Sequence, residues 1–201
     1  MNDSGQLGTN TNVGTDAPNP TPTLVDSTDL GVVRQLALGD QHTCALRDDG
    51  RVLCWGLNDS GQLGHNTNVG TSASNPTPTL VASTDLGVVR QLALGDDHTC
   101  ALRDDGRVLC WGLNDFGQLG NNTNLGTVAP NVTPTLVDST DLGVVRQLAL
   151  GVFHTCVLRD DGRVLCWGLN ASGQLGTNTN VGTNNPNPAP LLVEGLPLLL
   201  P

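Results

Sequence analysis

Residues 39–64 read GDQHTCALRDDGRVLCWGLNDSGQLG, and this segment recurs almost unchanged from Gly95 and again from Gly151. Each copy starts 56 residues after the previous one, and the surrounding sequence repeats with it. A fixed period of this order indicates a solenoid, propeller or array, in which each unit stacks on its neighbours. We divide the chain, residues 1–201, into one repeat domain with units at 2–57, 58–113 and 114–169 and a partial unit at 170–201.

One repeat has the pattern of four short strands. Residues 32–39, VVRQLALG, are an apolar, β-branched run that ends in glycine, as buried strands often do. Two further strands, 42–47 and 51–56, flank the turn Asp48-Asp49-Gly50. The fourth is TPTLV, residues 21–25, in which proline stands near the start, where a missing N–H does least harm. Its counterparts are 77–81, 133–137 and 190–193.

The turn sets the register of the central hairpin. A three-residue turn with its glycine in the left-handed conformation makes Leu46 face Val52, and two residues further Cys44 faces Cys54. Apolar side chains then lie on both faces of the hairpin, so both faces need cover. Four antiparallel strands stacked between similar units predict an all-β propeller blade.

The repeated segment is similar to the repeat of the regulator of chromosome condensation family. That pattern runs glycine, His-Thr, an apolar leucine, Asp-Gly, Trp-Gly, asparagine and Gly-Gln-Leu-Gly, and this chain shows it three times. The resemblance implies a β-propeller of four-stranded blades. It also implies that the histidines of His-Thr, His42, His98 and His154, belong to the framework of the repeat.

The number of strand sets predicts an open propeller. Three sets of the first three strands accompany four outer-strand segments, and closed propellers have about 4 to 8 blades. We therefore expect about three blades in an open arc, with one extra outer segment. Exposed blade faces at the two ends predict either a homodimer or the missing repeats of a longer propeller.

The six cysteines predict three disulfides within the hairpins. Strand parity places each pair at a non-hydrogen-bonded position, where the β-carbons come closest. The predicted pairs are Cys44 with Cys54, Cys100 with Cys110, and Cys156 with Cys166. An even cysteine count at fixed spacing fits an oxidising compartment. Buried free thiols remain an alternative, and so does a zinc site at His42, Cys44 and Cys54, which lacks a fourth ligand.

Composition narrows the class of partner and the location. The formal net charge is −10, and all nine basic residues are arginine, which disfavours nucleic acid and anionic membranes as partners. No apolar run reaches the length of a membrane span. Met1 stands directly before a repeat boundary without a signal peptide, so we expect a truncated or excised chain rather than a mature secreted N-terminus. The cysteine pairs predict an extracellular or cell-surface protein.

No residue pattern predicts catalysis, a cofactor or a metal. The paired carboxylates Asp48 and Asp49 are explained by the hairpin turn. The segment NTNVGT, residues 10–15, lacks the carboxylates of a calcium loop. Tryptophan occurs once per repeat at a framework position, which is more typical of core packing than of a ligand platform. The chain has no lysine, and no nucleophile, base and orienting group can be assembled.

The repeats differ mainly in two connections of each blade. We call the link between the first and second strands the inner connection and the link between the third and fourth the outer connection; both leave the same side of an up-and-down blade. We name that side the loop face. Neutral drift would produce the same concentration of differences. If the differences are selected, the candidate partner-binding residues are His65, Asp96, Asp97, Phe116, Val152 and Phe153.

Two functions follow as hypotheses. The first is a non-enzymatic, secreted or surface-exposed scaffold that binds a protein partner through the loop face. The second is implied by the family resemblance: guanine-nucleotide exchange on a small GTPase, which certain eukaryotic relatives perform in the nucleus. The cysteine pairs favour the first hypothesis.

Overall fold

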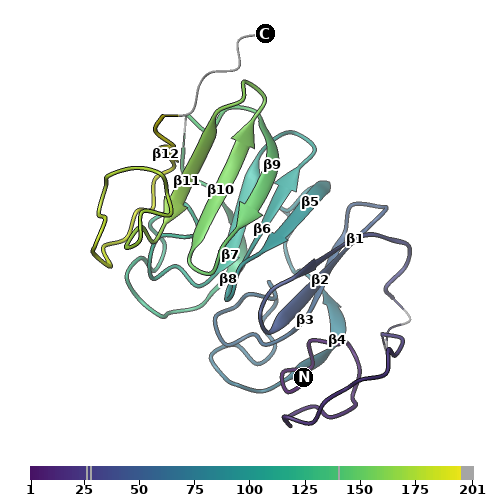
Figure 1. The fold of residues 1–201 in the computed structure, drawn as a ribbon. Coiled ribbons are helices and arrows are strands. Elements are labelled where there is room, and N and C mark those ends of the chain that lie inside the picture. Colours follow the sequence, from purple (N-terminus) through teal and green to yellow (C-terminus); the bar gives the residue numbers. More distant parts are fainter. Residues whose placement is uncertain (26, 28, 140, 196–201) are drawn as a thin grey trace.

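The computed structural model describes residues 1–195 except 26, 28 and 140. All regular structure in this part is β-strand, arranged as three four-stranded antiparallel sheets (Figure 1). None of the described residues form a helix that could cross a membrane. The predicted fold class, an open all-β propeller, is therefore confirmed.

Each sheet is one blade, and its strands follow one another in chain order. The first blade contains β1 (Val33–Leu38), β2 (His42–Arg47), β3 (Val52–Gly56) and β4 (Asn75–Leu80). The second contains β5 (Val89–Leu94), β6 (His98–Arg103), β7 (Val108–Gly112) and β8 (Asn131–Leu136). The third contains β9 (Val145–Leu150), β10 (His154–Arg159), β11 (Val164–Gly168) and the short β12 (Leu191–Leu192). Each blade thus takes its fourth strand from the following repeat.

One predicted strand is wrong. Residues 21–25 form no strand, although their counterparts at 77–80 and 133–136 lie within β4 and β8. An outer strand needs the third strand of its own blade as a partner, and the described chain has no blade before β1. The end of the partial repeat, residues 196–201, lies outside the described residues.

The predicted hairpin register is confirmed in all three blades. Leu46 pairs with Val52 and Cys44 with Cys54, and the same pairs recur 56 and 112 residues later. Gly50 has a φ of 81°, and its N–H donates to the carbonyl of Arg47. The three-residue turn therefore sets the register as expected.

Each hairpin carries a disulfide between its two strands. The structure joins Cys44 to Cys54, Cys100 to Cys110 and Cys156 to Cys166, with Cα–Cα distances of 4.2, 4.2 and 4.1 Å. No cysteine of the described chain is free. The pairing is the one that strand parity predicts.

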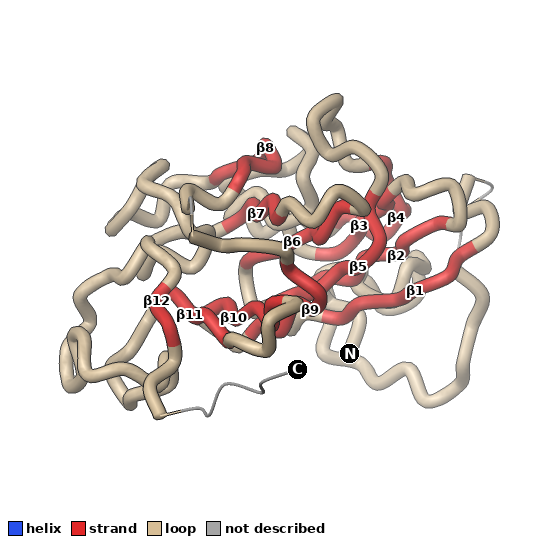
Figure 2. The backbone as a smooth tube through the Cα atoms, turned by 90° about the horizontal axis from the view of Figure 1, so that it is seen from above, coloured by secondary structure: helices blue, strands red, loops and turns tan. Residues whose placement is uncertain are grey.

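The hydrophobic core lies between the blades. The Cys face of a blade carries its disulfide together with residues such as Leu46 and Val52, and the opposite Trp face carries residues such as Ala101 and Trp111. The Cys face of the first blade packs on the Trp face of the second, and the second packs on the third in the same way. Figure 2 shows the innermost strands β1, β5 and β9 side by side.

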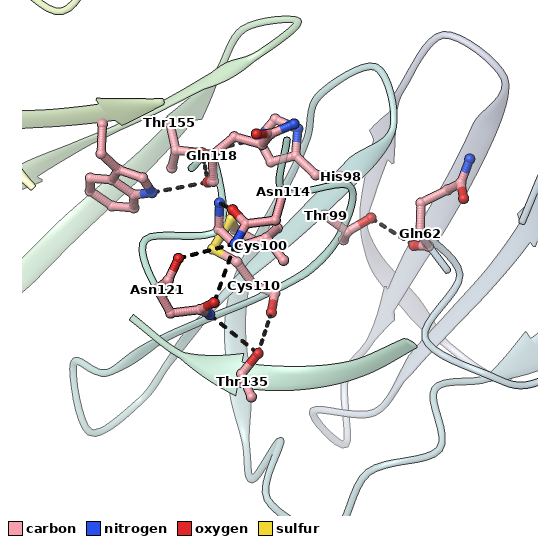
Figure 3. Close-up of a disulfide and its surroundings, with 12 residues drawn as sticks. Gln62, His98, Thr99, Cys100, Cys110, Asn114, Gln118, Asn121, Thr135 and Thr155 are labelled. Carbon is pink, nitrogen blue, oxygen red and sulfur yellow. Dashed lines mark hydrogen bonds between the residues drawn. A yellow bond between two sulfur atoms is a disulfide. The ribbon is translucent and has the colours of Figure 1, made fainter. Parts of the chain in front are cut away.

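A buried polar node joins consecutive blades. The main-chain oxygen of Gln62 accepts hydrogen bonds from Trp111 Nε1 and Thr99 Oγ1, each 2.9 Å long. Because the Thr99 hydroxyl is the donor there, its oxygen accepts from His42 Nε2 of the preceding blade, at 2.9 Å. The same node forms from Gln118, Trp167, Thr155 and His98 at the next junction (Figure 3).

Glycine precedes each of these histidines because the ring leaves no room for a side chain. A Cβ at Gly39 would lie 2.5 Å from Nδ1 of His42, and a Cβ at Gly95 would lie 2.3 Å from Nδ1 of His98. The Gly-x-x-His-Thr spacing of the repeat therefore follows from the packing of the ring on the inner connection.

The two ends of the arc differ. On the first blade, the N-terminal segment covers part of the Trp face, since Gln6 O accepts from Trp55 Nε1 and Thr43 Oγ1. Leu36 and Leu38 stay exposed at 61% and 71%, whereas their counterparts in β5 are 2% and 9% exposed. On the third blade, the Cys face is only partly covered.

We predict that oxidised protein contains no titratable thiol and that proteolytic mapping recovers only the three within-hairpin pairs. Replacing Cys100 and Cys110 by alanine should lower the free energy of unfolding by about 3 kcal/mol, because each bond closes a loop of about ten residues. Urea denaturation measures this loss. Links between different repeats would contradict the predicted pairing.

Candidate interaction face

The inner and outer connections lie together on one side of the molecule, as the strand order requires. Main-chain hydrogen bonds of 2.9 Å join Leu57 to Gln41, Leu113 to Asp97 and Leu169 to Phe153. Each bond runs from the start of an outer connection to the inner connection of the same blade. Within each blade, the two connections therefore form one surface rather than two separate loops.

Buried asparagines hold the outer connections in shape. The side-chain amide of Asn58 donates to the carbonyls of His65 and Thr67, and its oxygen accepts from the N–H of Leu63. Asn2, Asn114 and Asn170 make the equivalent bonds, and all four side chains are fully buried. These long, glycine-rich segments thus present surface residues from a fixed backbone.

Three of the predicted candidates make up what we call the apolar spot: the packed rings of Phe116 and Phe153, and Val152, which precedes Phe153 in the chain. Phe116, from the outer connection after β7, packs edge to face on Phe153, from the inner connection between β9 and β10, with ring centroids 5.2 Å apart. Both rings are half-buried, and the adjacent Val152 is 52% exposed. The other repeats carry serine at the place of Phe116 and polar residues at the places of Val152 and Phe153, so the spot occurs once on the described surface.

Carboxylates lie beside this spot. Burial, and after it the negative charges of Asp96, Asp59, Asp40 and Asp115, raise the pKa of Asp97 to about 6. The pKa of Asp96 is also raised, first by burial and then by Asp40. Asp97 Oδ1 lies 3.3 Å from the Gln62 amide, which donates to it. Inner and outer connections therefore bring several acidic groups close together.

A groove crosses the loop face at the ends of the innermost strands. It has a volume of about 520 Å³ and is lined by residues 38–40, 94–96 and 150–152. Leu38, Leu94 and Leu150 give it apolar walls, and Asp40 and Asp96 give it negative charge. Val152 belongs both to the groove and to the apolar spot.

The structure changes the membership of the predicted set in two ways. His65 lies beneath the loop face, only 4% exposed, and burial lowers its pKa. Asp40 is not in the predicted set and lines the groove close to Asp96. The sequence could have indicated Asp40, because it occupies in the first blade the position that Asp96 has in the second and Val152 has in the third.

Burial keeps two of the framework histidines neutral near pH 7. It lowers the pKa of both His42 and His98 to about 3, and it also lowers the pKa of His154. Within the described chain, no three histidine, cysteine or acidic side chains meet in a group that could hold a metal ion.

Comparison with known proteins identifies the family. The "Regulator of chromosome condensation (RCC1) repeat" matches residues 1–46, 49–102, 105–158 and 161–198, nearly the whole chain. A second form of the same repeat matches 33–62, 89–118 and 145–174. The chain therefore belongs to the family of RCC1-repeat proteins.

Similar proteins of known name are much longer than this chain. It is 36% identical to human "Probable E3 ubiquitin-protein ligase HERC4" over 198 residues, which is 97% of this chain and 17% of that protein. It is 32% identical to human "E3 ubiquitin-protein ligase HERC2" over 91% of this chain and 4% of that protein. For the "Ultraviolet-B receptor UVR8" of Arabidopsis thaliana, the identity is 31% over 87% of this chain and 37% of the receptor.

Solved structures support the same fold. Human WBSCR16 superposes with a TM-score of 0.74 at 27% identity, covering 96% of this chain and 45% of that one. Prp20p of Saccharomyces cerevisiae, described with its binding to Gsp1p and histones, gives a TM-score of 0.70 at 25% identity, covering 81% and 38%. The chain thus spans less than half of the propeller proteins that it resembles.

We predict that Asp97→Asn stabilises the protein at pH 7.5. A folded-state pKa of about 6 against an ordinary value of 3.8 means that folding favours the protonated form. That contribution is fully present below pH 3.8 and is lost as pH rises through 6, so ionised Asp97 opposes folding at pH 7.5. Allowing for solvent screening of a half-buried carboxylate, removing the charge should add about 1 kcal/mol, or about 2 to 4 °C in Tm.

Thermal melts at pH 7.5 and pH 4 measure this effect. The gain should shrink at pH 4, because Asp97 is then largely protonated in the folded state. The matched control is Asp104→Asn, in an exposed hairpin turn. An equal gain in the control, or a gain that does not depend on pH, would contradict the assignment.

Proposed function

We propose that this chain is a non-enzymatic scaffold that binds a protein partner through the loop face. The observation that carries the proposal is the apolar spot of Phe116, Val152 and Phe153, which interrupts an otherwise near-identical repeat on a rigid surface. Aromatic side chains at the centre of a polar surface are typical of binding hot spots. The named relatives include proteins described by their binding to other proteins, such as Prp20p with Gsp1p and histones.

We further propose that the protein works outside the cell or on its surface. Three disulfides, one in every blade, are bonds that persist in oxidising compartments and are rare in the cytosol. Nucleic acid is a poor partner for a chain with a net charge of −10. The location and the class of partner are consistent with each other.

Nucleotide exchange on a small GTPase is the second candidate. It is supported by membership of the family and by the similarity to Prp20p, which is described with Gsp1p. The chain covers 38% of Prp20p, and the disulfides fit a nuclear protein poorly. Stimulated release of labelled GDP from purified small GTPases would support exchange, and no release would favour the scaffold.

Association at the ends of the arc remains part of the proposal. Both ends of the arc have apolar surface like that buried at the internal junctions. At one end it is the Cys face of the third blade, and at the other it is Leu36 and Leu38 of the first blade. A second copy, or further repeats, would cover them. In a head-to-tail dimer, however, residues 2–25 of one copy and 170–193 of the other would compete for one junction. We therefore expect association only if one of these segments is displaced.

Replacing the residues of the apolar spot by their counterparts in the first repeat, Ser4, Asp40 and Gln41, tests the scaffold. In the triple variant Phe116→Ser, Val152→Asp and Phe153→Gln, loss of the aromatic pair should cost about 1 kcal/mol of stability, leaving the fold intact. Partner capture from surface or secreted fractions of the source should fall strongly. The control is Val32→Ser, which changes an exposed side chain on the opposite side.

Quantitative mass spectrometry of the captured proteins gives the readout. Proteins that bind the unaltered chain and the control, and are lost with the triple variant, support the loop face. Equal capture by all three proteins would contradict it. Circular dichroism of each variant shows that folding is not the cause of a loss.

A further inference from the structure

The charges of this protein are segregated between its two sides. The inner and outer connections, together with the N-terminal segment of the same kind, contain seven of the 19 acidic residues and none of the nine arginines. The acidic residues of this set are Asp3, Asp16, Asp40, Asp59, Asp96, Asp97 and Asp115. Most of the formal net charge of −10 therefore belongs to the loop face.

The arginines gather at the opposite ends of the strands. Arg47, Arg103 and Arg159 stand at the hairpin turns and form ion pairs of 2.9 to 3.0 Å with Asp49, Asp105 and Asp161. Arg34 and Arg90, near the starts of β1 and β5, donate to carbonyls of the following blade. On that side nine arginines face twelve acidic residues, whereas the connections of the loop face contain seven acidic residues and no arginine.

The groove combines this negative charge with apolar walls. Asp40 and Asp96 stand at its rim, close enough that Asp40 adds to the rise in the pKa of Asp96, and Leu38 is 71% exposed. The apolar spot continues from the groove through Val152. A ligand that fits must supply positive charge and apolar side chains together.

From these observations we propose that the loop face binds a cationic polypeptide segment, with lysine or arginine side chains over the groove and an apolar side chain on the Phe116–Phe153 spot. This inference rests on the proposed loop-face scaffold and adds the chemistry of its partner. The negative electrostatic potential of the loop face would attract such a segment toward the groove and speed its association at low salt.

Fluorescence anisotropy with labelled model peptides tests the proposal. The probe is the peptide KKKLFKKK, and its matched forms are EEELFEEE and QQQLFQQQ. We expect binding of the lysine form alone, weakened about tenfold when NaCl rises from 50 to 300 mM, because screening shortens the reach of the charges. Equal binding of the glutamine form, or no binding of the lysine form at 50 mM NaCl, would overturn the proposal.

Two triple variants with the same change in net charge locate the site. Asp40→Asn, Asp96→Asn and Asp97→Asn neutralise the loop face, and Asp48→Asn, Asp104→Asn and Asp160→Asn neutralise the exposed hairpin turns. The first set should weaken KKKLFKKK about tenfold and the second less than about twofold. Equal losses would show a general effect of net charge and overturn the site.

Capturing partners with both loop-face variants shows which proposal is wrong if one fails: the cationic partner proposed here, or binding through the loop face itself. If the loop face binds a partner that is not cationic, capture will fall in the variant of Phe116, Val152 and Phe153 but persist with the loop-face aspartates neutralised. If the loop face binds no partner, neither variant will change capture. Loss of capture in both loop-face variants, with the hairpin-turn variant unaffected, supports the cationic partner.

Discussion

The hydrogen bonds that meet at one main-chain oxygen between consecutive blades hold the repeat together. The main-chain oxygen of Gln62 accepts hydrogen bonds from Trp111 Nε1 and Thr99 Oγ1. Thr99 Oγ1 in turn accepts a hydrogen bond from His42 Nε2 of the preceding blade. Two blades and the connection between them thus meet in a single buried node. Polar groups buried at 0 to 1% exposure are costly without partners, so each member of the node holds the others in place.

This node gives a physical reason for the spacing of the repeat. Histidine and threonine start the second strand, tryptophan lies near the end of the third, and Gly-Gln-Leu-Gly turns the outer connection back so that its carbonyl reaches them. The same framework fixes the loop face, because inner and outer connections both leave the node. Substitutions in those connections can then change surface chemistry, as at Phe116 and Phe153, without moving the backbone that presents them.

Local sequence rules predicted most of the fold. Parity and turn type gave the register and the cysteine pairs, because both depend only on neighbouring strands. The strand expected at 21–25 failed because pairing is not local: its partner would belong to a blade that the described chain lacks. The blade ends were also beyond prediction in detail, since nothing in the sequence showed that residues 2–25 would fold onto Trp55.

The candidate site was predictable only in part. Differences between repeats indicated Phe116 and Phe153, whose rings pack on each other in the structure, Val152 next to them in the chain, and the carboxylates nearby. These differences do not show how deeply a side chain is buried, so His65 was expected at the surface although it is buried. The groove, with Asp40 close to Asp96, depends on how neighbouring blades stack, which periodicity does not specify.

The most direct test of the node between blades is to compare the free energies of unfolding of the variants Thr99→Val and Thr43→Val. Both hydroxyls donate to a glutamine carbonyl, but only Thr99 also accepts from a histidine of the preceding blade. Thr99→Val should therefore cost about 1 to 2 kcal/mol more than Thr43→Val in urea denaturation, because it leaves the buried Nε2–H of His42 unpaired. Equal losses in the two variants would show that the node does not couple the blades.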